Sequence, residues 1–482
     1  MNNSNRRATT NTVLLICLRV LMPVLSVALI LAISRFLGPA GLGRYTLALS
    51  MLYVINAIAP LGLSAIVTRE CARDPAQLDV VLRSALKLST IASLICIPIM
   101  IASGFVLNYD DETRLGLMVL SAGVIPFTVG TMVESALVAK ERIDFLAISA
   151  CVENVLKVGL GVALLATGFG VVSVLVMVVL GRVAFCFTSI YYLRRLGIKL
   201  SRGNDPQIGK QLLKLAPTFF LIGIFATLYW RIDIFMLSSL KSVEDVGFYG
   251  AAYRLHELAM IFPQSLCLAI YPQIVSATQN NLSALDSLGK TSSRYLAAIG
   301  LPVVICTILL ASPILTALYG ESFRVAAPTL AVLIFTLLPY SIVRYHAYIL
   351  VGANRQRIDL YLNIIMAAIN IALNLILIPK YSYFGAAVAT LVAVCFYAII
   401  QYGYIRVYLP RYAAPISVKG VVLASSAIVG LGAWMLRDIN VIGVTIAAGF
   451  AYLSLLYIGG FFSKTELQMF GIGRLIDRLG IR

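Results

Sequence analysis

The sequence predicts an all-α integral membrane protein of about 14 transmembrane helices. Of its 482 residues, 60% are hydrophobic and only 12% are charged, whereas soluble domains contain about 25% charged residues. Long, nearly charge-free runs recur from Thr12 to Phe462, and a spanning helix needs about 20 apolar residues. No polar stretch between these runs is long enough to form a catalytic head domain.

The apolar runs define the predicted spans. They cover 12–34, 45–68, 82–106, 115–139, 146–166, 171–193, 212–239, 247–276, 293–319, 327–352, 357–379, 384–409, 415–436 and 440–462. Helices are expected because backbone polar groups cannot stay unpaired in hydrocarbon, and the runs lack the alternation of barrel strands. The first run does not resemble a cleaved signal peptide, because it contains Arg19 and no small-residue cleavage site follows it.

The distribution of Lys and Arg predicts the orientation in the membrane. Of 38 such residues, 25 fall in the segments on the side of the N-terminus, 7 on the opposite side and 6 within spans. Cytoplasmic loops carry the excess of positive charge, so we expect both termini in the cytoplasm. The net charge of +17 therefore reflects topology, and we expect no nucleic-acid partner. The eight cysteines include no CxxC pair and predict neither a disulfide framework nor a metal site.

Short matches indicate an internal repeat. Gly43-Arg44-Tyr45 opens the second span as Gly247-Phe248-Tyr249 opens the eighth, and Arg142-Ile143-Asp144-Phe145 precedes the fifth as Arg357-Ile358-Asp359-Leu360 precedes the eleventh. Six spans in each half make the halves parallel, which is a transporter layout with a cavity between two lobes. We therefore predict lobes at 1–200 and 201–410 around a central cavity. Two further helices and an amphipathic cytoplasmic tail follow at 411–482.

Ten charged residues remain within the predicted spans once those at the loops and span ends are set aside. The cations are Arg19, Lys157, Arg182, Arg231, Arg254 and Arg344, and the acids are Glu134, Glu153, Asp233 and Glu257. A cation at the centre of a membrane helix costs about 2.5–3.5 kcal/mol, so each should face a counter-charge or a wet cavity. The guanidinium fork suits phosphate, so the excess of arginine predicts an anionic substrate. The acids are candidates for ion coupling.

Spacing along the helices predicts local pairs. Glu153 lies four residues before Lys157, and Arg254 lies three residues before Glu257, so each pair can share a helix face. Arg231 and Asp233 are two residues apart and cannot. Arg182 and Arg344 have no acid within reach on their own helices, which leaves snorkelling, packing between helices or ligand contact as interpretations. We favour substrate contact for Arg19, Arg231 and Arg254.

Two segments resemble a known family. The first loop of bacterial polysaccharide flippases is similar to the segment Ser34-Arg35-Phe36-Leu37-Gly38-Pro39-Ala40-Gly41-Leu42-Gly43-Arg44-Tyr45. The start of the second half is also similar to these flippases, through Arg231-Ile232-Asp233 followed by Val243-Glu244-Asp245-Val246-Gly247-Phe248-Tyr249. With its spans and its repeat, the chain resembles Wzx-type lipid-linked oligosaccharide flippases along nearly its whole length. In this motif Arg35, Gly38, Pro39 and Gly43 are candidates for a gating role.

The resemblance implies a function. The substrate would be an oligosaccharide repeat unit on polyprenyl pyrophosphate, moved to the outer leaflet of the bacterial inner membrane by alternating access, with coupling to an H⁺ or Na⁺ gradient left open. A polysaccharide polymerase and chain-length machinery are the implied partners. We expect no cofactor and no catalytic residue, and no nucleotide-binding Gly-rich loop is present.

Three alternatives remain. A lipid II flippase would share the span count and the cationic cavity. A drug/cation antiporter of the multidrug and toxic compound extrusion (MATE) type should show cavity carboxylates and usually fewer spans. A membrane enzyme such as a polymerase or ligase should carry a large outer loop, which this sequence lacks.

Overall fold

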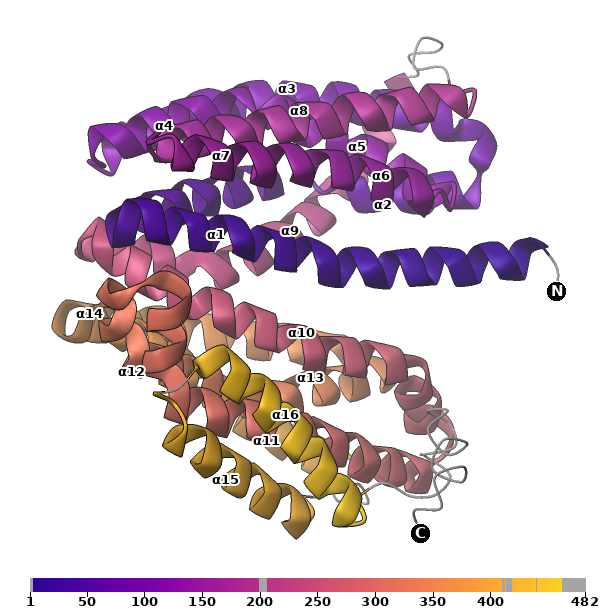
Figure 1. The fold of residues 1–482 in the computed structure, drawn as a ribbon. Helices are drawn as coiled ribbons and strands as arrows, with labels where there is room; N and C mark the ends of the chain where they lie inside the picture. The colour runs from indigo at the N-terminus through magenta and orange to yellow at the C-terminus, as the bar shows by residue number, and fades with distance from the viewer. Residues whose placement is uncertain (1–2, 199–205, 410–411, 413–417, 439, 462–482) are drawn as a thin grey trace. The chain divides into compact units, whose positions relative to one another are not determined.

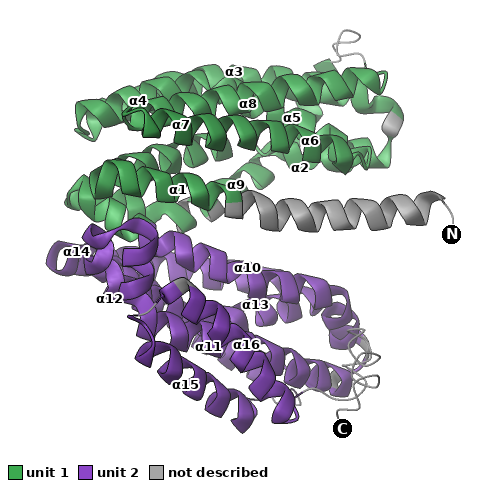
Figure 2. Ribbon diagram, viewed as in Figure 1, with its two compact units in different colours: residues 1–250 green, residues 251–482 purple. Residues whose placement is uncertain are grey.

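The computed structural model is helical throughout the part of the chain that it describes, and no β-strand occurs there (Figure 1). The described residues are 3–198, 206–409, 412, 418–438 and 440–461, without the side chains of 3–24, 75, 222, 226, 228, 229, 280, 282 and 442. The amphipathic segment predicted at the C-terminus lies outside these residues. Packing divides the chain into two compact units, Met1–Gly250 and Ala251–Arg482 (Figure 2). The lobe boundaries predicted from the repeat stay a prediction.

Unit 1 is built from long helices and a few short turns. They are α1 (Asn3–Ile58), α2 (Leu63–Arg73), η1 (Pro75–Gln77), α3 (Leu78–Val106), α4 (Asp111–Ala122), α5 (Val124–Ala139), α6 (Ile143–Asn154), η2 (Val155–Leu160), α7 (Gly161–Ala166), α8 (Val171–Arg195) and α9 (Pro206–Leu240). α10 (Val243–Asn280) begins in unit 1 and continues into unit 2.

Unit 2 continues with helices of the same kind. They are α11 (Leu282–Tyr319), η3 (Glu321–Ala326), α12 (Ala327–Phe335), α13 (Leu337–Gly352), α14 (Gln356–Tyr408), α15 (Gly420–Met435) and α16 (Val441–Ile458). α11 packs against α12, α13, α15 and α16, and α13 packs against α14.

The helices account for the predicted spans. Among the described residues, nine helices are long and apolar enough to cross a membrane, and the pair α4–α5, bent by 43°, makes a tenth. α1 and α14 each contain two of the predicted spans, joined at a non-helical residue. α15 and α16 are the shorter apolar helices. The predicted count of fourteen is compatible with this arrangement.

The two long helices are broken at single residues. In α1 the break is Gly38, with φ 65° and ψ −164°, and in α14 it is Ser382, with φ 49° and ψ −134°. A positive φ is readily adopted only by glycine, which explains Gly38 in the predicted loop motif. Each break allows the second half of the helix to turn back without a long connecting loop.

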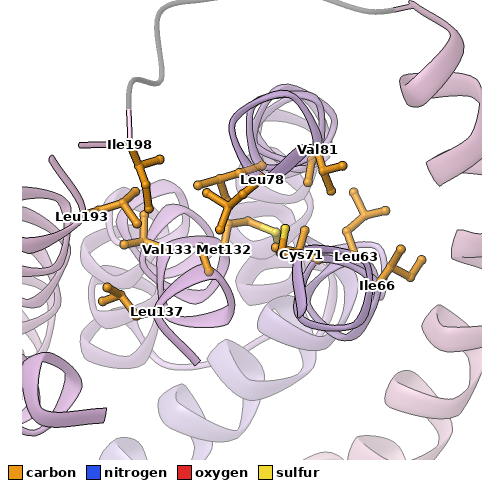
Figure 3. Packing of buried hydrophobic residues seen from close by; sticks show 14 of the residues in the cluster. Leu63, Ile66, Cys71, Leu78, Val81, Met132, Val133, Leu137, Leu193 and Ile198 are labelled. Carbon is orange, nitrogen blue, oxygen red and sulfur yellow. The ribbon is translucent and has the colours of Figure 1, made fainter. Parts of the chain in front are cut away.

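Apolar side chains hold unit 1 together where α2, α3, α5 and α8 meet. Leu63 of α2, Val81 of α3, Met132 and Val133 of α5 and Leu193 of α8 are buried in one cluster (Figure 3). In unit 2 a similar cluster joins α10, α11, α13 and α14, and another joins α11 to α15 and α16. Burial in these clusters positions the helices that carry the charged residues.

Candidate functional site

Arg182 of α8 lies at the centre of a buried polar cluster in unit 1. One guanidinium nitrogen is 3.3 Å from a carboxylate oxygen of Glu153 on α6, and the side chains are only 11% and 15% exposed. A second nitrogen donates to the Phe127 carbonyl and the Thr131 hydroxyl, and the guanidinium lies 4.2 Å from the centroid of the Phe185 ring. The counter-charge of Arg182 therefore comes from a neighbouring helix.

Two more predicted residues surround this pair. Glu134 lies on an exposed part of α5, close enough to Arg182 and Glu153 for charge interaction. Lys157 lies in η2, a π-helical turn that follows Glu153. π-Turns are rare and occur often at functional sites. The structure thus brings together four of the charged residues named from the sequence, on α5, α6, η2 and α8.

Arg231 and Asp233 of α9 have different neighbours. The Arg231 guanidinium is 4.7 Å from the centroid of the Tyr53 ring on α1, which is cation–π distance. The Asp233 carboxylate accepts a hydrogen bond of 2.8 Å from the Tyr249 hydroxyl and is buried. The side chain of Arg19 lies outside the described side chains, so its neighbours stay a prediction.

The Arg254–Glu257 pair predicted from the sequence is confirmed in unit 2. A guanidinium nitrogen of Arg254 is 3.0 Å from a Glu257 carboxylate oxygen, and the two side chains are 22% and 25% exposed. The pair neutralises itself on α10. The charge of Arg254 is therefore balanced by a glutamate side chain, as is the charge of Arg182 in unit 1.

Arg344 of α13 differs from these two arginines, because it makes no ion pair with any described carboxylate. Its guanidinium lies 5.6 Å from the centroid of the Tyr340 ring, one turn away, and its buried Nε has no hydrogen-bond partner among the described residues. Tyr348, one turn further along, packs on Tyr271 of α10 with ring centroids 4.7 Å apart. Arg344 therefore lies beside the Tyr340 ring with unused hydrogen-bonding capacity.

A half-buried acid near Arg344 was not among the site residues predicted from the sequence. Asp359, at the start of α14, accepts hydrogen bonds from the Tyr397 hydroxyl at 2.6 Å and the Gln401 amide at 3.0 Å, and it lies within reach of the charge of Arg344. In the repeat it matches Asp144, which instead pairs with Arg142 at 2.8 Å. The repeat itself was the available signal, because it marked Asp359 as a residue with a charged counterpart.

The loop motif lies at a close contact within unit 1. A methyl group on Gly43 would clash with the carbonyl oxygen of Val243, and one on Gly247 would clash with that of Pro39. Arg44 pairs with Asp110, the residue before α4, at 2.6 Å and with Glu112, in the first turn of α4, at 2.9 Å. Pro39 and Gly43 thus shape a helix–helix contact, whereas Gly38 forms the break in α1. A gating role for these three residues and for Arg35 stays a prediction.

Within the described part of the chain, no group of three or more His, Cys, Asp and Glu side chains is placed to hold a metal ion. The described cysteines are unpaired, and Cys71, Cys96 and Cys267 are buried.

The sequence is similar to those of two named transport proteins. The chain is 22% identical over 361 residues to a probable low-salt glycan biosynthesis flippase, Agl15 of Haloferax volcanii, covering 74% of this chain and 75% of that protein. It is 21% identical over 398 residues to a Shigella flexneri protein provisionally named an O-antigen transporter, covering 78% and 92%.

Solved structures share the fold at lower identity. The lipid II flippase MurJ in an inward closed conformation matches with a TM-score of 0.75 and 15% identity, over 93% of this chain and 98% of that one. An inward-facing multidrug resistance MATE family transporter of the MOP superfamily matches with a TM-score of 0.69 and 18% identity, over 81% and 95%. The profile of the family described as "Polysaccharide biosynthesis protein" matches residues 30–328. Because this match covers more than half of the sequence, the chain belongs to the polysaccharide biosynthesis protein family.

Proposed function

We propose that this multi-pass membrane protein is a flippase. It moves polyprenyl-pyrophosphate-linked oligosaccharides from the cytoplasmic to the outer leaflet of a bacterial inner membrane by alternating access. The observation that carries the proposal is the family match over residues 30–328, because polysaccharide biosynthesis requires a membrane carrier for lipid-linked intermediates. The names of the relatives, a glycan biosynthesis flippase and an O-antigen transporter, support the same substrate class.

The charged residues support an anionic head group. Arg344 has no carboxylate partner among the described residues and has an unused buried donor, and a guanidinium binds phosphate through two parallel hydrogen bonds. The Tyr340 ring beside it, and Tyr348 near Tyr340, suit the faces of sugar rings. We therefore propose Arg344 as the first contact for pyrophosphate, with Arg19 and Arg231 as further candidates.

The arginines that are paired with glutamates support a role in ion coupling. Arg182 and Arg254 each hold a glutamate, so their positive charge is already matched. We propose that Glu153, with Glu134 and Lys157 nearby, and Glu257, with Asp233 as a further candidate, contribute to ion coupling through changes in protonation or pairing during transport. Cytoplasmic termini and contacts with a polymerase and chain-length proteins are also parts of this proposal.

Complementation of a bacterial strain that lacks its O-antigen flippase tests the function. Expression of the chain should restore long surface polysaccharide, Arg344→Ala should abolish it, and Arg344→Lys should restore only part, because lysine keeps the charge without the fork. Arg437→Ala is the matched control, since Arg437 also lies over a ring, 4.4 Å from Trp434, but far along the chain from the proposed site.

Separate strains distinguish the alternatives. Rescue of a strain depleted of its lipid II flippase, without rescue of the first strain, would assign the chain to peptidoglycan precursors. Resistance to cationic dyes alone would assign it to drug export. Normal polysaccharide with Arg344→Ala, at equal protein levels in the membrane, would remove Arg344 from the site.

A further inference from the structure

A cavity inside unit 2 is separate from the charged residues considered so far. It has a volume of about 480 Å³ and lies between α11, α13 and α14. Its wall includes Leu301, Leu338 and Ile399. Pockets of about 300–1,000 Å³ hold drug-sized molecules, so this cavity has room for one acyl chain and is too small for a long polyprenyl chain.

Polar residues gather at one end of this cavity. Polar lining residues lie toward the α14 C-terminus, namely Ser293 of α11, His346 of α13 and Tyr402 of α14, and Tyr412 lies four residues beyond that helix. The lining residues farther from that end, such as Leu301, Leu338 and Ile399, are mostly aliphatic. An apolar chamber with one polar end matches the shape of a lipid, whose head group and tail differ in the same way.

His346 is the buried polar group at that end. It is only 3% exposed, and its Nδ1 has no hydrogen-bond partner among the described residues. The rings of Tyr345, Tyr402 and Tyr412 surround it, with centroids 6.1 to 6.2 Å from its own. A buried ring nitrogen without a partner is costly, and an oxygen of a bound molecule would satisfy it.

Two cations meet beside the polar end. The Arg294 guanidinium lies 5.1 Å, and the Lys419 ammonium 5.5 Å, from the centroid of the same ring, Phe461. Ser293 and Val418, their neighbours in sequence, line the cavity. Lys290, next to the lining residue Gly289, adds a third cation, whereas Asp286 and Asp359, which accepts a hydrogen bond from Gln401 beside the lining residue Tyr402, are described acids on this side. The balance of charge favours an anion.

We propose that this cavity binds an anionic phospholipid of the cytoplasmic leaflet, such as phosphatidylglycerol. One acyl chain fills the cavity, the phosphate lies between Arg294 and Lys419, and His346 hydrogen-bonds to a polar oxygen of the lipid. Basic pockets between helices on the cytoplasmic side of a membrane bind anionic head groups, and the distribution of Lys and Arg places this end of α11 and α14 on that side. The bound lipid would stabilise unit 2 independently of any transported substrate.

Thermal unfolding of the full chain in nanodiscs tests the site. Replacing phosphatidylcholine with increasing phosphatidylglycerol should raise the Tm to a plateau, since a ligand stabilises the state that binds it. Arg294→Gln/Lys419→Gln should lose this rise, and Arg437→Gln, a control cation over Trp434, should keep it. An equal rise in the double variant would overturn the proposal, as would an equal rise with glycerol phosphate added to phosphatidylcholine discs.

A second variant and a photoreactive lipid separate loss of lipid binding from loss of folding. Ala297→Phe places a ring in the cavity without changing charge, so it should remove the rise while leaving the Tm in phosphatidylcholine close to that of the original chain. Phosphatidylglycerol with a photoreactive acyl chain should label peptides 289–301 and 338–346 of the original chain. Labelling confined to other helices, or a Tm rise with polyprenyl phosphate but none with phosphatidylglycerol, contradicts the proposed occupant.

Discussion

Gly43 and Gly247 lie backbone to backbone in unit 1. A methyl group on Gly43 would lie 3.1 Å from the amide nitrogen of Gly247, and one on Gly247 would lie 3.1 Å from that of Gly43. The two glycines occupy equivalent positions in the repeat, Gly43-Arg44-Tyr45 and Gly247-Phe248-Tyr249. The repeat therefore brings two equivalent helix starts together, and both need glycine because no side chain fits between them.

Gly43→Ala should destabilise the protein by about 1–3 kcal/mol, the usual range for overpacking. The added methyl group collides with the Val243 carbonyl, which belongs to a helix and cannot move freely. Gly223→Ala is the control, because open space surrounds Gly223 on α9. Thermal unfolding in detergent compares the two variants, and equal Tm values would show that the close contact is absent in the membrane protein as purified.

Neutralising one member of the Arg182–Glu153 pair should cost more than neutralising both. Arg182→Gln leaves the Glu153 charge buried, and removal of one partner from a buried pair costs about 3–5 kcal/mol. The double variant Arg182→Gln/Glu153→Gln removes both charges and should recover part of that loss. Unfolding of the four proteins in a double-mutant cycle measures the coupling. Additive losses would contradict a direct pair at 3.3 Å.

The two repeat-related aspartates should respond differently to alanine. Asp359→Ala leaves the buried Tyr397 and Gln401 donors without an acceptor, which costs about 1–3 kcal/mol. Asp144→Ala removes a partly exposed pair with Arg142, whose side chains are 35% and 41% exposed, and exposed pairs contribute about 0–1 kcal/mol. Tm measurements should therefore rank Asp359→Ala well below Asp144→Ala, and the reverse order would argue against the buried network.

The predicted orientation can be checked with single cysteines at exposed positions. Ser242→Cys, between α9 and α10, should react with a membrane-impermeant maleimide on intact spheroplasts. Glu141→Cys, between α5 and α6, should react only after lysis. Both residues are exposed, so a difference reports the side of the membrane. The unsubstituted chain, with its native cysteines, sets the background. Labelling of Glu141→Cys before lysis would reverse the topology.

Much of the fold was predictable because bilayer thickness sets the length of a span. The run from 12 to 68 predicted two spans with Gly38 between them, and the structure places the break of α1 at that glycine. Local spacing also predicted the Arg254–Glu257 pair, because three residues apart on a helix is a contact distance. The partner of Arg182 was not predictable in this way, since Glu153 lies 29 residues earlier on another helix.

The sequence by itself determined that this is a membrane protein of many helices and which charges lie within them, and it predicts which side of the membrane its loops face. These properties follow from composition and from periodicity along one helix. Only the tertiary structure decided that Arg182 is matched by Glu153 while Arg344 pairs with no described carboxylate, that Asp359 and Asp144 have different partners, and that Gly43 meets Gly247. Those outcomes depend on how helices pack against one another, and the distances between side chains on different helices are not encoded in any local pattern.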